Sequence, residues 1–331
     1  MTSSNRWDVA RANAWYARQP WPVGCNFTPS TAINQLEMWQ ADTFDPQTID
    51  RELGWAAGIG FNTVRVYLHD LLWEADAEGF KARMERYLAI AARHGIRTLF
   101  VLFDDCWNPN PRLGKQPDPI PGVHNSGWVQ SPGQAVVRDP SAWARLEPYV
   151  KGVIGAFARD DRVLLWDLYN EPGNSDLREA SVPLLRLAFE WAREAAPSQP
   201  ISCGVWADFA PIRELQLAAS DVITFHDYED TAHLEAQIAE LGQYGRPLIC
   251  TEYMARTRGS RFETHLPIFK RERVGAINWG LVAGKTQTNY PWRSPQGAPE
   301  PQVWFHEVFH GDGTPYDPAE VAAIRAYAGE G

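Results

Sequence analysis

The chain of 331 residues is long enough for one large domain or two ordinary ones, and its 44% hydrophobic and 22% charged residues are typical of a globular protein. Its net charge of -10, with no long Lys/Arg cluster, excludes the basic face that a nucleic-acid partner requires. No uninterrupted apolar run is long enough to span a membrane, so no membrane association is expected.

The N-terminal residues and the cysteines predict a reducing, cytoplasmic setting. Residues 1–20 are rich in charged side chains and lack the apolar segment of a secretion signal. The cysteines are dispersed without a CxxC pair, and three of them fall in expected strands, which favours reduced core thiols over disulfides or a zinc site. The sequence gives no prediction of the oligomeric state. The four cysteines are Cys25, Cys106, Cys203 and Cys250.

Along the chain, short apolar segments alternate with segments of helical periodicity. A long Pro-, Gly- and Asn-rich loop over residues 104–139 exceeds an ordinary connection and is expected to be functional. Gly95 is placed to end one helix and Ser141 to cap the next. The expected strands cover residues 23–28, 61–68, 97–103, 163–170, 200–206, 221–226, 246–252 and 274–280. The expected helices cover residues 48–59, 78–94, 141–159, 176–195, 212–219, 231–244, 262–273 and 318–328.

This order of elements predicts an α/β fold with a single (β/α)8 TIM barrel and long loops on its carboxyl-terminal face. Strands separated by helices imply right-handed parallel crossovers, and no linker-like change of composition divides the chain. Residues 23–331 would form the catalytic domain, with residues 1–22 as an N-terminal extension packed on it. A doubly wound open sheet is the alternative, disfavoured because no GxGxxG or P-loop motif follows any strand.

Two glutamates stand at expected strand ends. An apolar run reaches Asn170 and Glu171 and is then ended by Pro172, which cannot extend a hydrogen-bonded strand, and Gly173, which permits a sharp turn. Glu252 ends the seventh expected strand, after the apolar run PLICT. In a barrel the carboxyl ends of the strands meet at one face, so these two carboxylates would share a pocket. A pair of carboxylates is what cleavage of a glycosidic bond requires.

These residues belong to a larger ordered set. The chain resembles the retaining (β/α)8 glycoside hydrolases of clan A, and most resembles family 5, the cellulase and mannanase group. The resemblance covers nearly the whole chain in the correct strand order. The residues that carry it are Arg65 in FNTVRVYL, Asn170-Glu171-Pro172, His226-Asp227-Tyr228, Thr251-Glu252 and Trp279.

The resemblance implies that Glu171 is the general acid/base and Glu252 the nucleophile of a double displacement through a covalent glycosyl-enzyme. Asn170 would donate a hydrogen bond to the sugar 2-hydroxyl. The reaction would proceed with retention of configuration and would need neither a metal nor another cofactor.

The same resemblance implies supporting roles for four further residues. Arg65 and Tyr228 would hold Glu252 ionised and oriented, and His226 would line the pocket beside Tyr228. Trp279 would form an apolar floor beneath the sugar at the cleavage point. For each of them, a purely structural role in the core is the alternative.

A second group of residues lies near expected loops of the same face. Residues 120–133 are the predicted wall of the cleft, and His69 and Asp104 depart from the pattern of the family. The candidates for substrate binding or support are Glu37, His69, Trp107, His124, Trp128, Trp206 and Lys285, with Trp39, Asn108, Gln287 and Trp292 beside them.

The expected partner is a small β-linked oligosaccharide or glycoside, and mannosides, glucosides, galactosides and xylosides all remain open. Long loops after the first, third and eighth strands would close one end of the cleft and make the enzyme exo-acting. One alternative is a sugar-binding barrel without catalysis. Another is a metal-dependent hydrolase, which lacks an HxH or HExxH spacing here; its ligands would come from His69, Asp104, Asp105, His226 and Asp227.

Overall fold

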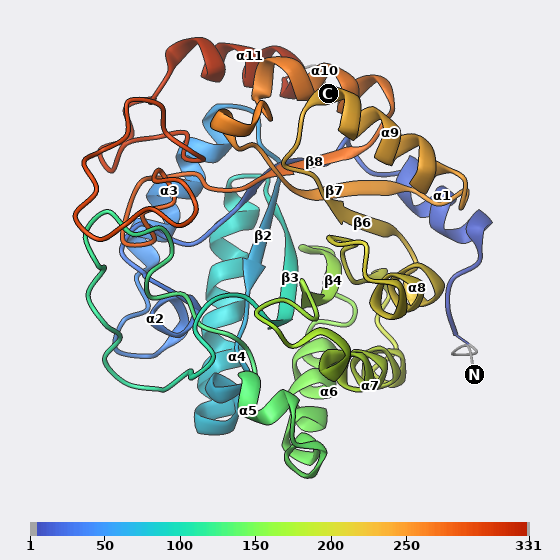
Figure 1. Cartoon of the computed structure of the whole chain (residues 1–331). Coiled ribbons are helices and arrows are strands. Elements are labelled where there is room, and N and C mark those ends of the chain that lie inside the picture. The colour runs from blue at the N-terminus through green and yellow to red at the C-terminus, as the bar shows by residue number, and fades with distance from the viewer. Residues whose placement is uncertain (1–4, 330–331) are drawn as a thin grey trace.

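The computed structural model describes residues 5–329 and contains one eight-stranded sheet in which every ladder is parallel. Helices lie between successive strands along the chain and surround them in space (Figure 1). The predicted (β/α)8 barrel is therefore confirmed. The strands are β1 (Val23–Asn26), β2 (Thr63–Tyr67), β3 (Arg97–Asp104), β4 (Val163–Asn170), β5 (Ile201–Ser202), β6 (Ile223–His226), β7 (Leu248–Tyr253) and β8 (Gly275–Asn278).

The ladders run in the order β5-β4-β3-β2-β1-β8-β7-β6, and the barrel closes between β5 and β6. Within residues 5–329, the one β-bridge between these two edges is the isolated bridge of Val205 to Phe225. The amide of Val205 donates to the carbonyl of Thr224 at 2.8 Å, and the amide of His226 donates to the carbonyl of Val205 at 2.9 Å. The seam thus brings Trp206, which follows Val205, next to His226 at the carboxyl-terminal face.

The eight expected helices are present, most with different ends, and the structure adds α1, α2 and α5, which were not expected. The outer helices of the barrel and the short helices of its loops are α1 (Val9–Ala17), α2 (Gln35–Trp39), α3 (Pro46–Gly58), α4 (Asp70–Arg93), α5 (Gln134–Val137), α6 (Leu146–Ala156), α7 (Ser181–Glu194), α8 (Ala210–Ala219), α9 (Thr231–Gly242), α10 (Phe262–Arg271) and α11 (Pro318–Ala328). Three 3-10 helices accompany them, η1 (Pro140–Arg145), η2 (Arg178–Ala180) and η3 (Arg256–Arg258).

Local capping explains the main differences from the expected boundaries. Helix α4 begins at Asp70, where the His69 ring accepts the amide N–H of Leu71 at 3.2 Å. The expected start at residue 78 follows a break inside α4 at Asp76, whose φ of -160° and ψ of 76° are not helical and whose carboxylate accepts the Gly79 amide at 2.9 Å. Asp139, not Ser141, caps the segment before α6, since its carboxylate accepts the Ser141 amide at 3.0 Å. Helix α7 begins at residue 181 rather than 176, because Asp176 has a left-handed φ of 65°.

The N-terminal segment covers the amino-terminal end of the barrel. Trp7 and Trp15 pack in one apolar cluster with residues from the amino ends of the strands, among them Leu99 and Leu164. The Trp7 amide also donates to the Asp221 carboxylate at 2.8 Å. Since this end is filled by aromatic side chains, access to the barrel is from the carboxyl-terminal face. In the described part of the chain, no helix combines the length and apolar composition needed to cross a membrane.

Two long loops form a joint wall on the carboxyl-terminal face. The loop that follows β3 and the one that follows β8 lie side by side in Figure 1. The amide of Asn125 donates to the carbonyl of Thr286 at 2.9 Å, and the amide of Gly297 donates to the carbonyl of Pro121 at 2.8 Å. The side chain of Gln287 adds a bond to the carbonyl of Ile120 at 2.8 Å. The two loops are therefore fixed to each other across one side of the barrel mouth.

Candidate active site

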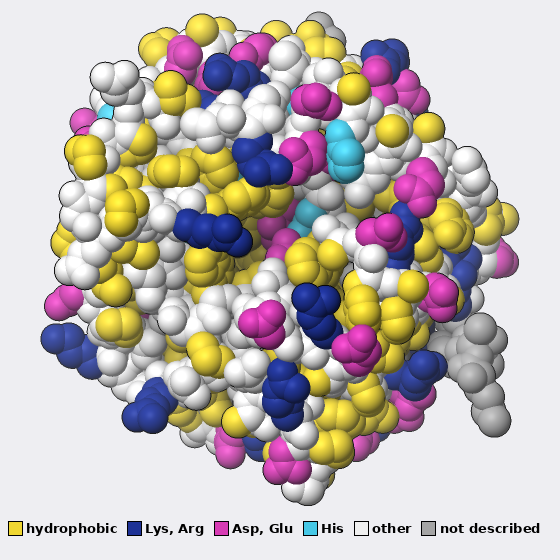
Figure 2. Space-filling model, in the orientation of Figure 1, with side chains coloured by type: hydrophobic (Ala, Val, Ile, Leu, Met, Phe, Trp, Pro, Cys, Tyr) yellow, Lys and Arg dark blue, Asp and Glu magenta, His cyan; other side chains and the backbone are white. Residues whose placement is uncertain are grey.

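A cavity of about 1110 Å³ opens at the carboxyl ends of the strands. Figure 2 shows it as a hollow with hydrophobic side chains on its walls, acidic and histidine side chains at its floor and basic side chains at its rim. Both Glu171 and Glu252 line it, although they come from β4 and β7 on different sides of the barrel. The fold thus brings together the two carboxylates that the sequence predicted to share a pocket.

Glu171 stands where β4 ends in a tight turn. Its φ is 45°, which is uncommon for a residue with a side chain, and strain of this kind persists only where the surroundings enforce it. Gly173 follows with a φ of 86°, and a Cβ atom there would come within 2.6 Å of Ile212. The sequence Glu-Pro-Gly therefore stops the strand and turns the carboxylate into the cavity.

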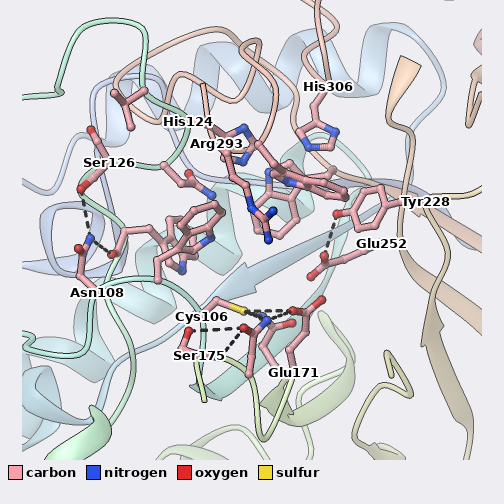
Figure 3. Close-up of a pocket in the computed structure, with 18 of the residues that line it drawn as sticks. Cys106, Asn108, His124, Ser126, Glu171, Ser175, Tyr228, Glu252, Arg293 and His306 are labelled. Carbon is pink, nitrogen blue, oxygen red and sulfur yellow. Dashed lines mark hydrogen bonds between the residues drawn. The ribbon is translucent and has the colours of Figure 1, made fainter. Parts of the chain in front are cut away.

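Three donors surround the Glu171 carboxylate. His226 Nδ1 lies 2.9 Å from Oε1, and Asn174 Nδ2 donates to Oε2 at 2.6 Å. The Cys106 thiol donates to the same Oε2 at 3.3 Å (Figure 3). Burial alone would raise the pKa of Glu171, but the hydrogen bond and charge of His226, with the thiol and the amide, bring that pKa below its usual value. These contacts consequently favour the carboxylate form of Glu171.

Glu252 is held by a different set of donors. Arg65 Nη1 lies 2.7 Å from its Oε1, and the Tyr67 hydroxyl donates to the same atom at 2.9 Å. The Tyr228 hydroxyl donates to Oε2 at 2.8 Å. His226 Nδ1 lies 3.6 Å from that oxygen and so stands between the two carboxylates. Each glutamate therefore has its own partners, and one imidazole lies close to both.

Arg65 also orients the other polar groups of the floor. Its fully buried guanidinium lies 2.8 Å from Asp167 and donates to Asn170 Oδ1 at 2.8 Å. The Asn170 amide in turn donates to Asp104 at 2.9 Å, and the indole N–H of Trp128 donates to the same carboxyl group at 2.7 Å. Burial raises the pKa of Asp104 to about 7. The amide of Asn170 is thus fixed in one orientation at the cavity surface.

Aromatic side chains form the walls. The ring of Trp279 lies 6.0 Å from that of Trp128 and 5.9 Å from that of Tyr67, both edge-on. On the opposite wall, Trp292 packs edge-on against Tyr228 with ring centres 5.0 Å apart. Flat apolar faces beside convergent polar groups are typical of sites that bind small ring-shaped molecules.

Most of the candidates from the sequence meet at this cavity. His226 contacts both glutamates and lines a neighbouring pocket, while Arg65 lies beneath Glu252. Those that line the cavity itself are Trp107, Asn108, His124, Trp128, Asn170, Glu171, Trp206, Tyr228, Glu252, Trp279 and Trp292.

Five candidates lie away from the cavity lining. His69 caps α4, and the indole of Trp39 donates to the carbonyl of Tyr67 within the core. Lys285 and Glu37 form an ion pair with each other, and Gln287 joins the two long loops. These side chains stabilise the loops and helices around the cavity and do not line its surface.

The sequence interpretation did not single out Tyr67, which contacts Glu252, or Cys106 and Asn174, which contact Glu171. Tyr67 follows Arg65 by two residues on β2, so strand alternation places both side chains on one face and could have indicated it. Cys106 had no such signal, because it lies in the irregular loop after β3.

One ligand atom each from Glu171, His226 and Glu252 lie within 4.8 Å of one another, the spacing of a metal site. The Arg65 cation, 2.7 Å from Glu252, opposes a divalent ion there. The metal ligands considered from the sequence do not converge, because His69 caps α4 and Asp227 lies 2.9 Å from His233. The geometry therefore fits proton transfer and carboxylate chemistry better than metal binding.

The fold and the cavity define a (β/α)8 barrel with a two-glutamate site at its carboxyl-terminal face. No protein-family model matches the sequence, and no curated protein is similar to it in sequence. Similarity is found among solved structures.

A GH5_18 protein from Streptomyces cattleya, solved with Manβ1-4GlcNAc, matches 92% of this chain and 80% of its own, with a TM-score of 0.64 and 16% identity. The exo-β-1,4-mannosidase Op5Man5 from Opitutaceae bacterium strain TAV5 matches 93% of this chain and 59% of its own, with a TM-score of 0.62 and 19% identity. A glycoside hydrolase family 5 mannosidase from Rhizomucor miehei matches 92% of both chains, with a TM-score of 0.60 and 15% identity. The resemblance to clan-A barrels is thus confirmed at the level of the fold.

Proposed function

We propose that the protein is a retaining β-glycoside hydrolase that acts on short β-linked oligosaccharides, with Glu171 as acid/base and Glu252 as nucleophile. The observation that carries the proposal is the convergence of the two carboxylates on His226, with an oxygen of each and the imidazole nitrogen within 4.8 Å of one another. Retaining enzymes keep their carboxyl groups about 5–5.5 Å apart, whereas inverting enzymes need about 6.5–9.5 Å to admit a water molecule.

In the first step Glu252 attacks the anomeric carbon and forms a glycosyl ester, while Glu171 gives its proton to the departing oxygen. In the second step Glu171 removes a proton from water, which attacks the same carbon and releases Glu252. Arg65, Tyr67 and Tyr228 hold the nucleophile in place by their hydrogen bonds. Asn170 is assigned the contact with the sugar 2-hydroxyl.

Glu171 needs a proton for the first step, although its contacts lower its pKa. A sugar bound on Trp279 would exclude water from the cavity and so disfavour the charged form of Glu171. Binding of the substrate therefore promotes the protonated form of the acid.

The wall formed by the two long loops supports exo action, because it crosses one side of the cavity mouth and would block a continuing polymer chain. β-Mannosides are the first substrates to test, since the similar folds include an exo-β-1,4-mannosidase and a family 5 mannosidase. A barrel that only binds sugar needs no separate sets of donors for two adjacent carboxylates, so catalysis is the favoured reading.

The test is a panel of aryl β-mannosides, glucosides, galactosides and xylosides, with the first-formed anomer read by NMR. We expect the β-anomer, and we expect Glu252→Ala to lose turnover and recover part of it with azide, giving a product of inverted configuration. An α-anomer as the first product, or a strict need for a divalent ion, would contradict the mechanism. Cleavage of a labelled polymer at internal bonds would contradict exo action alone.

A further inference from the structure

Two arginines line the cavity outside the pair of glutamates. Arg258 lies in η3 and Arg293 in the long loop after β8, and both face the same space. Figure 2 shows basic side chains at the rim of the hollow. Cations at this place stand out in a chain whose net charge is -10.

The two arginines differ in whether an acidic side chain pairs with their charge. Arg258 forms an ion pair with Glu229, and its guanidinium lies 5.7 Å from the centre of the Trp292 ring. Arg293 is exposed and, within residues 5–329, has neither an ion-pair partner nor a hydrogen-bond acceptor for its guanidinium. Figure 3 shows its side chain pointing into the cavity, between His124 and Tyr228. The cavity thus contains one guanidinium with all of its donors available.

The backbone holds Arg293 in this position. Its φ of 64° is left-handed, a conformation that costs energy for a residue with a side chain. Both neighbours are anchored, because Trp292 packs against Phe305 with ring centres 4.9 Å apart and the Ser294 hydroxyl accepts the His124 amide at 3.1 Å. A strained, anchored turn that aims a cation into a cavity reduces the ordering cost of binding.

We propose that the substrate carries an anionic group, the carboxylate of a uronic acid or a sulfate or phosphate ester, on a sugar bound beside the cleavage point. The guanidinium of Arg293 matches the paired oxygens of such a group with two parallel N–H donors, and Arg258 adds positive charge nearby. Glu171 and Glu252 repel an anion in the same cavity, so an anionic sugar needs this local cation, whereas a neutral hydroxyl does not. The inference rests on the proposed function in that the bound molecule is a glycoside.

The test uses matched pairs of short β-linked oligosaccharides built on mannose, glucose and galactose, in which one member has its C6 hydroxyl oxidised to a carboxylate. Sulfate and phosphate esters at the same carbon are further arms. Titration calorimetry with the wild-type protein at low salt should show the preferred anionic member binding about tenfold more tightly, or better, than its neutral partner. Added salt should reduce that preference.

Arg293→Gln should remove the preference and Arg293→Lys should retain part of it, since lysine keeps the charge but not the fork of donors. Arg186→Gln is the matched control, because it deletes the same charge from an exposed position on α7 and should keep the full preference. Equal affinity within every pair, no binding by any anionic member, or a preference that survives Arg293→Gln would overturn the proposal.

The outcomes also separate this inference from the proposed function. Anionic sugars that bind with the expected preference but are never hydrolysed would contradict the hydrolase and leave the anion site standing. Hydrolysis of neutral glycosides with retention, without any preference for charge, would support the hydrolase and remove the anion site.

Discussion

Nδ1 of His226 lies 2.9 Å from Oε1 of Glu171, so the proposed acid/base shares a hydrogen bond with a side chain that also reaches toward the proposed nucleophile. This contact is the largest cause that lowers the pKa of Glu171 against the effect of burial. The same hydrogen bond therefore sets both the position of the Glu171 carboxylate and its pKa.

The pH dependence of kcat/KM should follow from this contact. In the proposed mechanism the protonated form of Glu171 is the active one, and its lowered pKa means that kcat/KM should fall as the pH rises through that value. In His226→Phe the lowering contact is lost while burial remains, so the pKa should rise and the alkaline limb should move to higher pH. Profiles of kcat/KM against pH for both proteins check this, and an alkaline limb that stays in place or moves to lower pH would count against it.

Glu171→Ala should affect substrates according to their leaving group. Loss of the proton donor should slow hydrolysis of natural glycosides by about 10²–10⁴-fold, because alkoxides leave poorly without protonation. Activated aryl glycosides should be slowed far less in their first step. Glu179→Ala, an exposed glutamate in the following η2 segment, serves as control and should keep the wild-type rates. Equal losses on both kinds of substrate would argue against the role of Glu171.

Arg65 should be as important for stability as for the site. Its guanidinium is the only ion-pair partner of Asp167 within residues 5–329, and both side chains are fully buried. Arg65→Met leaves a buried carboxylate without its cation and should lower the free energy of unfolding by about 3–5 kcal/mol. Arg271→Met, which removes an exposed cation from two surface ion pairs, should cost less than about 1 kcal/mol. Urea unfolding measures the free energy of unfolding of both variants. Adding Asp167→Asn to Arg65→Met should restore part of the lost free energy of unfolding, because it removes the unpaired buried charge.

A buried carboxyl group behind the site should make stability depend on pH. Glu307 borders a small cavity behind Trp279, and burial raises its pKa to about 8 from 4.5. A carboxyl with a raised pKa binds its proton more tightly in the folded state, so its contribution is full below pH 4.5 and is lost as the pH rises toward 8. Glu307→Gln removes this pH-dependent loss. The difference in free energy of unfolding between Glu307→Gln and wild type should therefore rise by at least about 1 kcal/mol, in favour of the variant, from pH 5 to pH 8. The exposed Glu272→Gln should show no such rise. Thermal unfolding at the two pH values decides.

The sequence predicted the barrel and the two glutamates because each depends on local signals. Apolar strands alternate with amphipathic helices, and the turn residues after Glu171 mark a strand end. His69 shows the limit of that reasoning, since it also follows a strand but its ring is taken up in capping α4. Glu37 and Lys285 were predicted near the cleft, yet they pair with each other, because a loop's path decides which side chains meet. The contact of Cys106 with Glu171 likewise depends on the fold of a long irregular loop.

The seam between β5 and β6 has a consequence for where the barrel opens locally. In the described residues, every other junction of the barrel is a parallel ladder of two or more residue pairs, whereas the edges here are joined by the bridge of Val205 to Phe225 and a few neighbouring bonds. Local opening costs least where the fewest backbone bonds break. Amide hydrogens around this seam should therefore exchange with solvent before those of β2 and β3. His226 and Trp206 lie directly above this seam, so its local opening would widen the cavity on that side. The proposed substrate would then enter the cavity from the side of the seam.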